Sequence, residues 1–355
     1  MRKWWKYGIY ALVGIVVLLM VLPFTLYIPA VQRAVKNFAT SYASEATGYE
    51  ISIDQILLQF PLDLKVDGVC MLDEQRDTML SEQSLLVDVS LLPLINLDVQ
   101  VNKALLTSAT YHLVTADSSL ILHARVKHAE VLPAEIRLAS NIVNLSQAQI
   151  SGAKIALQYF PEKAVKEDKE PSKGWTIRAQ KLTVDSIEYT MNMRPTIDSL
   201  HVALPHVDLD DGFVYTDSTA ITVSRLFVQD ADVLYNSKPG APSPGLDASH
   251  ILVKRASCQI ENYEQLGSAI TVPVTMLKAC ERSGVEITQG RCRFATTGKE
   301  MRVDSLLVKT MLSEIRGDAA LTMSLLDSIP KGSANLLASA KIGLGDISML
   351  YPNLK

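Results

Sequence analysis

A ten-residue pattern of apolar and polar positions recurs at least six times along the chain. It places apolar residues at positions one, three, eight and ten, two polar residues at positions four and five, and a small residue at position six. Each half alternates with a period of two residues, which is the signature of a β-strand with one apolar face. The copies begin at Ala104, Ala148, Leu182, Leu226, Ile251 and Val285.

Between the two halves the alternation slips by one residue, for example at Gln229-Asp230. A slip sends the second half to the opposite face unless a bulge or a tight bend absorbs it. The small residue after the slip suits the inner side of such a corner, and the copies carry Ala109, Ala153, Ala231, Ala256 and Gly290 there, with Ile187 as the exception. We therefore predict bent strands. Their uneven spacing favours one long sheet over a strict solenoid.

Beyond Gly48 the chain reads as strands almost throughout, with a hairpin turn at Asp73–Asp77 and polar loops at 162–174 and 236–247. One strand per dozen residues gives about 25 strands and a sheet on the order of 120 Å long. Few helical segments remain to cover the apolar face, and a bare aliphatic face of that size is unstable in water. We predict a mainly β fold whose long antiparallel sheet curls into a groove, or taco, that closes on itself or holds something apolar.

The first 28 residues predict a transmembrane signal anchor. No charged residue occurs from 7 to 32, and a helix over 8–28 would be about 31 Å long, enough to cross a hydrocarbon core. Three cations precede it, which predicts a cytoplasmic N-terminus. A cleavable signal peptide is the alternative, but no small-x-small cleavage site precedes Pro29. The membrane-spanning residues would include Leu12, Ile15, Val16, Leu18, Leu19 and Leu22.

A second helix is expected over 29–48, because Pro29 fits a first helical turn and Gly48 a stop. Its apolar residues recur at intervals of three and four: Val31, Val35, Phe38 and Tyr42. This amphipathic helix either caps the end of the sheet, which we favour, or lies on a membrane surface. The expected organisation is an anchor at 1–28, this helix at 29–48, and the sheet at 49–355, whether or not the sheet continues past the given chain.

Charge and motifs argue against several classes of function. Lys and Arg total 34 against 38 for Asp and Glu, with no basic stripe, which argues against nucleic acid as a partner. The acidic turn Asp208–Gly212 lacks the ligand spacing of a calcium loop and has Thr219 where the bidentate Glu would stand. The sequence has no nucleophile, phosphate-binding or zinc-protease motif. We predict no catalytic residue, no metal and no cofactor.

The four cysteines show no metal-ligand spacing and are interpreted as small apolar residues: Cys70, Cys258, Cys280 and Cys292. One alternative stays open. Cys258 and Cys292 occupy the same slot in two copies of the pattern, so they could face each other across neighbouring strands. A disulfide between them would require an oxidising compartment.

An ordered set of motifs spans roughly the first hundred residues. It consists of Ile28–Gln32, Ser44–Ile53, Phe60–Leu64, Leu72-Asp73 with Asp77–Leu80, and Leu91–Leu94. With this set the chain resembles the AsmA-like and TamB envelope proteins of the Bacteroidota type, as an N-terminal portion or a shorter relative. The resemblance implies a single-pass anchor in the bacterial inner membrane and a periplasmic β-groove.

The resemblance also implies a function, which is to conduct phospholipid between the inner and outer membranes and so support the outer membrane. The alternative that it implies is a scaffold in translocation and assembly of outer-membrane β-barrel proteins. The expected partners are phospholipid or another acyl-chain lipid, the inner membrane and, under the alternative, a barrel protein. An enzyme or another ligand-binding module is a third hypothesis, opposed only by the absence of a catalytic motif. The apolar slots expected to line the groove are Val184, Tyr189, Val228, Val233, Val253, Cys258 and Ile287.

Overall fold

The computed structural model describes residues 28–59, 63–73, 76–89, 101–115, 117–137, 141–161, 174–193, 197–322 and 332–352. They form a mainly β fold in which fifteen strands follow the chain order through one mostly antiparallel sheet. The chain divides into two compact units between Thr110 and Tyr111, within the fourth strand. We call residues 1–110 unit 1 and residues 111–355 unit 2.

Unit 1 begins with a helix that lies against the first strand. Its elements are α2 (Pro29–Thr47), β1 (Glu50–Gln59), β2 (Asp63–Leu72), β3 (Thr78–Val89) and the first part of β4 (Val101–Val114). The predicted helix is confirmed, and Gly48 ends it in the left-handed conformation at φ 76°. The Lys36 ammonium donates to the Asp54 carbonyl at 2.9 Å, which ties α2 to β1. The predicted hairpin between β2 and β3 is also confirmed.

The predicted membrane anchor, with Leu12, Ile15, Val16, Leu18, Leu19 and Leu22, lies outside the described residues. Among the residues that the structure does describe, no helix combines the length and the apolar character needed to cross a membrane.

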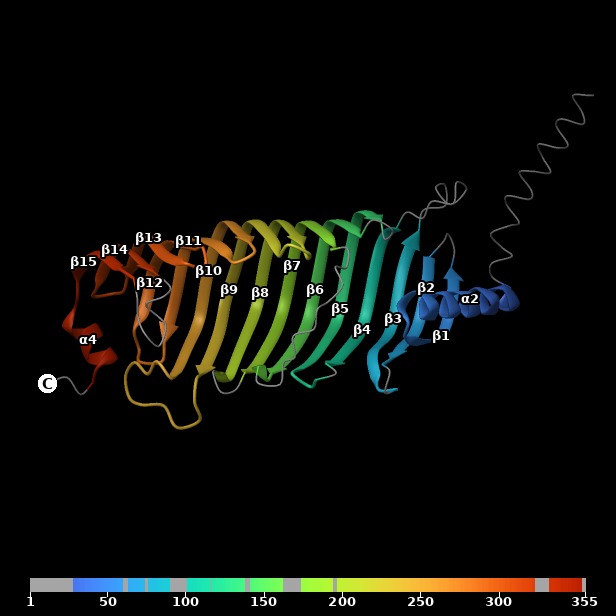
Figure 1. Cartoon of the computed structure of the whole chain (residues 1–355), viewed down its shortest axis with the longest axis horizontal. Coiled ribbons are helices and arrows are strands. Elements are labelled where there is room, and N and C mark those ends of the chain that lie inside the picture. The colour runs from blue at the N-terminus through green and yellow to red at the C-terminus, as the bar shows by residue number, and fades with distance from the viewer. Residues whose placement is uncertain are drawn as a thin grey trace, which may run out of the picture. The chain divides into compact units, whose positions relative to one another are not determined.

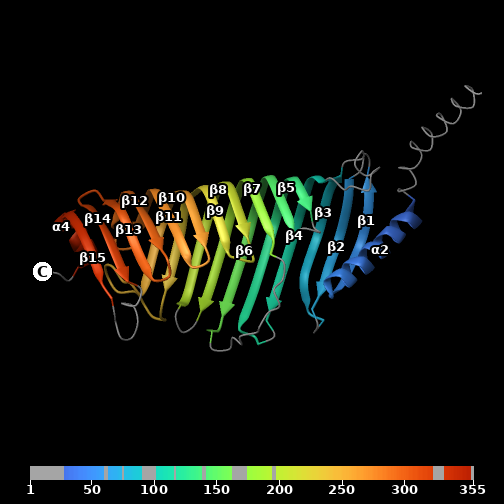
Figure 2. The ribbon, with the colours of Figure 1, turned by 45° about the horizontal axis from the view of Figure 1, so that its top comes forward.

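Unit 2 contains the long strands, which run side by side in chain order (Figures 1 and 2). After the end of β4 come β5 (Leu120–Arg137), β6 (Ile142–Tyr159), β7 (Thr176–Met193), β8 (Ile197–Tyr215), β9 (Ala220–Asn236), β10 (His250–Leu266), β11 (Ala269–Glu281), β12 (Glu286–Thr296), β13 (Glu300–Lys309), β14 (Glu314–Thr322), β15 (Ala334–Lys341) and the helix α4 (Leu344–Leu350).

Two predictions about strand number and direction are wrong. The pattern copies lie in single bent strands, as predicted, but β5–β10 each span 17–19 residues, so the described sheet has fewer and longer strands than the predicted number of about 25. The pair β6–β7 is parallel, whereas we expected an antiparallel sheet. β6 ends at Tyr159 and β7 begins at Thr176. In a parallel pair the two strands start at the same end of the sheet, so their connection must cross from one end to the other.

Most of the corners are made by a residue in the left-handed backbone conformation. In five of the six pattern copies this residue stands at position five: Ser108, Gly152, Ser186, Asp230 and Arg255, with φ between 50° and 66°. The sixth copy has Gln289 at that position, which is not among the described residues with positive φ. A left-handed residue turns the chain and reverses the alternation of the side chains that follow. The predicted slip is therefore a backbone corner, and both apolar halves stay on one face.

The corners of neighbouring strands lie at the same level. The pairs Ser151–Asp185 and Ala153–Ile187 place Gly152 of β6 beside Ser186 of β7. In the same way, Ser186 lies opposite Pro205 of β8, and Pro205 opposite Asp230 of β9. Because these strands turn together, their register is the same on both sides of the corner. The register of β13 and β14 instead shifts by one residue at Ser305, so this corner is a true β-bulge.

A side chain of the neighbouring strand caps the corner N–H in three strands. The Asp230 N–H donates to the Ser257 hydroxyl at 3.1 Å, and the Arg255 N–H donates to the Asp232 carboxylate at 3.0 Å. The Ser305 N–H donates to the Asp318 carboxylate at 2.7 Å. Since an unpaired backbone donor is costly, these polar side chains stabilise the corners.

The bend is local to this line of corners, and the sheet is not strongly curled, contrary to the prediction of a curled groove. The apolar face is nevertheless the inner side of the bend. Ala153 and Ala231, which follow the corner residues, are only 5% and 4% exposed, whereas Ser186, Asp230 and Arg255 are exposed. Figure 1 shows the strands of unit 2 turning over near one end.

We expect Arg255→Val to destabilise the protein by about 1–2 kcal/mol, because a β-branched residue is strained at positive φ. Arg255→Gly should be neutral or stabilising. Lys254→Val, at the neighbouring exposed position with ordinary φ, is the matched control and should change stability by less than about 0.5 kcal/mol. Thermal unfolding followed by circular dichroism measures all three. Equal losses for the two valine variants would contradict the role of the corner.

Candidate functional site

One face of unit 2 is apolar over many neighbouring strands. Directly paired residues of neighbouring strands share a face, so rows of paired residues trace it across the sheet. We call this the apolar face and define it by four rows that run across the strands. The first row is Ile150, Val184, Val207, Val228, Cys258 and Leu277. The second is Ile155, Tyr189, Val202, Val233 and Val253. The third is Leu157, Met191, Leu200, Tyr235 and Ile251, and the fourth is Ala148, Leu182, Leu209, Leu226, Ile260, Val274 and Cys292.

The apolar face is only half-buried. Val184 and Ala148 are buried, but most members of the rows keep intermediate exposure. In the described part of unit 2, α4 is the only helix, and its hydrogen bonds go to loops at one end of the sheet. The face therefore lacks the second layer of secondary structure that normally completes a hydrophobic core.

Six of the seven residues expected to line a groove lie in the first two rows. Val184, Val228 and Cys258 belong to the first row, and Tyr189, Val233 and Val253 belong to the second. Ile287 lies opposite Ala279 on β11, beyond these rows.

β8 carries none of the six pattern copies, yet it contributes Val202, Val207 and Leu209 to the same face. The signal was present in the sequence. The apolar alternation of β8 slips at Pro205-His206, as it does in the six copies. The copies have two polar residues at the slip, whereas β8 has a proline at one of these positions, so it does not match the pattern.

The facing arrangement considered for Cys258 and Cys292 is wrong. They lie on β10 and β12, which are separated by β11, and the four cysteines are free thiols. Burial raises the pKa of both thiols, so both stay protonated near neutral pH. This agrees with the interpretation of these cysteines as small apolar residues.

The opposite face carries an ionic cluster on β7 and β8, close to the line of corners. His206 Nδ1 lies 2.7 Å from an Asp185 carboxylate oxygen, and His206 Nε2 lies 3.0 Å from an Asp208 oxygen. The Thr183 hydroxyl donates to Asp208 at 2.8 Å. Hydrogen bonds with Asp185 and then Asp208 raise the pKa of His206, and the pKa of Asp208 is lowered by His206 and then Thr183. The cluster ties β7 and β8 together.

The polar loop predicted at 236–247 is held against the C-terminal helix. The Leu246 N–H donates to the Leu350 carbonyl at 2.9 Å, and the Arg282 guanidinium donates to the Ser243 carbonyl at 3.2 Å. Asp247 accepts hydrogen bonds from two backbone N–H groups and contacts buried His250, and these contacts lower its pKa strongly. Hydrogen bonds thus tie this loop to α4 and to Arg282, which follows β11. Residues 162–173 of the other predicted loop lie outside the described residues.

In comparisons with known proteins, no family model matches the chain and no curated protein matches it. Within the described ranges, no group of three or more His, Cys, Asp or Glu side chains is arranged to hold a metal ion. The fold and the site thus define a class, a mainly β protein whose bent sheet has one apolar and one polar face.

The His206 cluster predicts a pH-dependent contribution to stability. The pKa of His206 is raised, so the contribution is complete below about pH 6.5 and is lost as the pH rises through the folded-state pKa of His206. The pKa of Asp208 is lowered, so the contribution persists as the pH falls towards about pH 4. We expect His206→Gln to cost about 0.5–1 kcal/mol at pH 5.5 and less at pH 8.5, since the groups are partly exposed.

Thermal unfolding of the wild-type protein and of His206→Gln at both pH values measures this difference. His128→Gln is the control, because His128 is exposed and has no ion-pair partner among the described residues. A difference that stays constant with pH, or grows above pH 7, would refute the charged bridge.

Proposed function

We propose that this protein binds acyl-chain lipid, in the first place phospholipid, against the apolar face of unit 2 and conducts it between the inner and outer membranes of a bacterial cell envelope. In this proposal residues 1–28 anchor the chain in the inner membrane, with the bulk of it in the periplasm. The resemblance of the first hundred residues to AsmA-like and TamB proteins supports the setting. The proposal gives no residue a catalytic role.

The observation that carries the proposal is the continuity of the apolar face. Its rows cross at least five neighbouring strands without a charged residue, as in Ile155, Tyr189, Val202, Val233 and Val253. A ligand-binding pocket for one small molecule would need only a few such positions. The apolar face instead repeats from strand to strand across the sheet. Such a face suits a flexible hydrocarbon chain, which is bound through the apolar area that it buries.

The energetics favour a hydrocarbon ligand. Each methylene group that leaves water for an apolar surface contributes about 0.8 kcal/mol, so an acyl chain needs no specific polar contact to stay bound. The concave side of the line of corners is where such a chain would gain contacts with both halves of each strand. Polar headgroups would remain at the edges of the strands, in water.

Photo-crosslinking tests the proposal directly. A photoreactive amino acid at Val228 or Val253 should capture phospholipid from cells that express the full chain, because both positions lie on the apolar face. The matched controls are Gln229 and Lys254, one residue further along the same strands and exposed on the other face. We expect at least about fivefold more captured lipid at the valines, as mass spectrometry of the purified adducts would show. Equal labelling of the two faces would refute lipid binding at the apolar face.

A second candidate function is a scaffold for the assembly of outer-membrane β-barrels, and one observation favours it. All eight residues of β15 are exposed, and β15 pairs only with β14 among the described strands. An exposed strand edge presents unpaired backbone groups that accept a further strand.

The scaffold function predicts that a barrel protein copurifies through β15. Leu336→Lys together with Ala338→Lys should abolish the copurification, because charges on an edge strand block strand addition. Val228→Asn, on the apolar face, should leave it intact. The opposite result, with loss only on Val228→Asn, would favour lipid handling and remove the support for a scaffold.

A further inference from the structure

The strands β12–β15 form a pocket of about 400 Å³ on the face opposite the apolar rows. The pairs Arg291–Leu307, Leu307–Arg316 and Arg316–Ser339 make a row across these four strands. The adjacent row of Gly290 and Val308 continues the apolar face, so by alternation the arginine row points the other way. The pocket is therefore separate from the site proposed for acyl chains.

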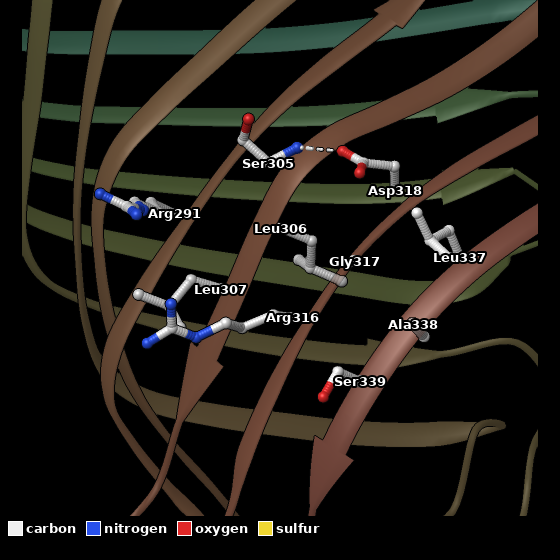
Figure 3. A pocket seen from close by; sticks show the side chains of 10 residues that line it. All are labelled: Arg291, Ser305, Leu306, Leu307, Arg316, Gly317, Asp318, Leu337, Ala338 and Ser339. Carbon is white, nitrogen blue, oxygen red and sulfur yellow. Dashed lines mark hydrogen bonds between the residues drawn. The ribbon is translucent and has the colours of Figure 1, made fainter.

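Two guanidinium groups flank the floor of the pocket. Arg291 and Arg316 project on either side of Leu307, as Figure 3 shows, and Leu307 is only 5% exposed. Arg316 forms an ion pair with Glu314, which also pairs with Lys309 at 3.3 Å. Arg291 has no ion-pair partner among the described residues. Two like charges on one row, of which one is unpaired, favour an anion between them.

The single carboxylate in the lining is occupied elsewhere. Asp318 lies at the other end of the pocket from the arginines and accepts the Ser305 N–H at 2.7 Å (Figure 3). It belongs to the β13 corner and does not pair with either guanidinium. The lining thus carries two cations and one anion, and its positive end is the end where Arg291 and Arg316 lie.

The rest of the lining is apolar. The lining also includes Leu306, Leu337 and Ala338, and Leu337, which lies opposite Asp318 away from the arginines, is 73% exposed to water (Figure 3). An inorganic anion would leave Leu337 exposed, whereas a ligand that joins an anionic group to a hydrocarbon chain would cover it. Guanidinium groups match phosphate and carboxylate oxygens with paired, charge-assisted hydrogen bonds.

We propose that this pocket binds an anionic amphiphile, whose phosphate or carboxylate lies between Arg291 and Arg316 and whose hydrocarbon part covers Leu337. This site goes beyond the proposed function. The apolar face would hold chains without regard to the headgroup, whereas the pocket selects for negative charge.

The test uses the purified full chain in a non-ionic detergent and three soluble probes, with native mass spectrometry as the readout. The probes are dihexanoyl phosphatidylglycerol, dihexanoyl phosphatidylcholine and glycerol phosphate. We expect the phosphatidylglycerol probe to bind at least about tenfold more tightly than the other two. Arg291→Gln together with Arg316→Gln should remove that preference.

The matched control is Arg293→Gln together with Arg302→Gln, which removes the same charge from β12 and β13 outside the pocket lining. It should change the affinity less than about twofold. Leu337→Gln, on the exposed edge strand, should weaken phosphatidylglycerol but not glycerol phosphate. Circular dichroism verifies that each variant is folded.

Three outcomes would overturn the site: equal binding of the two lipids, equal loss in the two arginine double variants, or glycerol phosphate binding as tightly as phosphatidylglycerol. The last outcome would indicate a site for free phosphate esters. Lipid capture at Val228 and Val253 should be the same in Arg291→Gln/Arg316→Gln as in the wild type. Failure of the pocket and failure of the apolar face are therefore distinguishable.

Discussion

The line of left-handed corners in unit 2 is the constraint on which the rest of the structure depends. Without it, the second half of each strand would turn its apolar residues to the polar face. Ser186 and Asp230 adopt positive φ although neither is glycine, which costs about 1–2 kcal/mol at each position. That cost is offset by burial of the small residues inside the bend and by capping of the freed N–H groups, as Asp232 does for Arg255.

The corners also explain how one sheet keeps two chemically different faces over so many strands. Since β6–β9 turn at one level, the rows continue through the bend without a change of register. Apolar side chains remain on the concave side. On the convex side, polar groups pair between strands, as the His206 ring does with Asp185 and Asp208. Both proposed binding sites follow from this separation of faces, the apolar rows on one side and the arginine pocket on the other.

The half-buried state of the apolar face is the physical link from fold to function. A sheet of this kind normally packs against helices or a second sheet. Here the described part of unit 2 offers only α4, whose hydrogen bonds go to Thr310, Ser313 and the loop around Leu246. Most side chains of the rows keep intermediate exposure. The remaining exposed area is available to a hydrocarbon ligand.

The sequence by itself determined which residues share a face, because the period of two and the slip at Gln229-Asp230 follow directly from strand geometry. It therefore predicted a mainly β fold, the position of the corners and six members of the two rows. It predicted one bent strand per copy but overestimated the number of strands, and it did not predict that β6 and β7 run parallel, since alternation is the same in either direction. The tertiary structure alone decided which strands are neighbours. It separated Cys258 from Cys292 by a strand and brought Arg291 and Arg316 to either side of Leu307, because register and neighbour order are set by hydrogen bonds between distant segments.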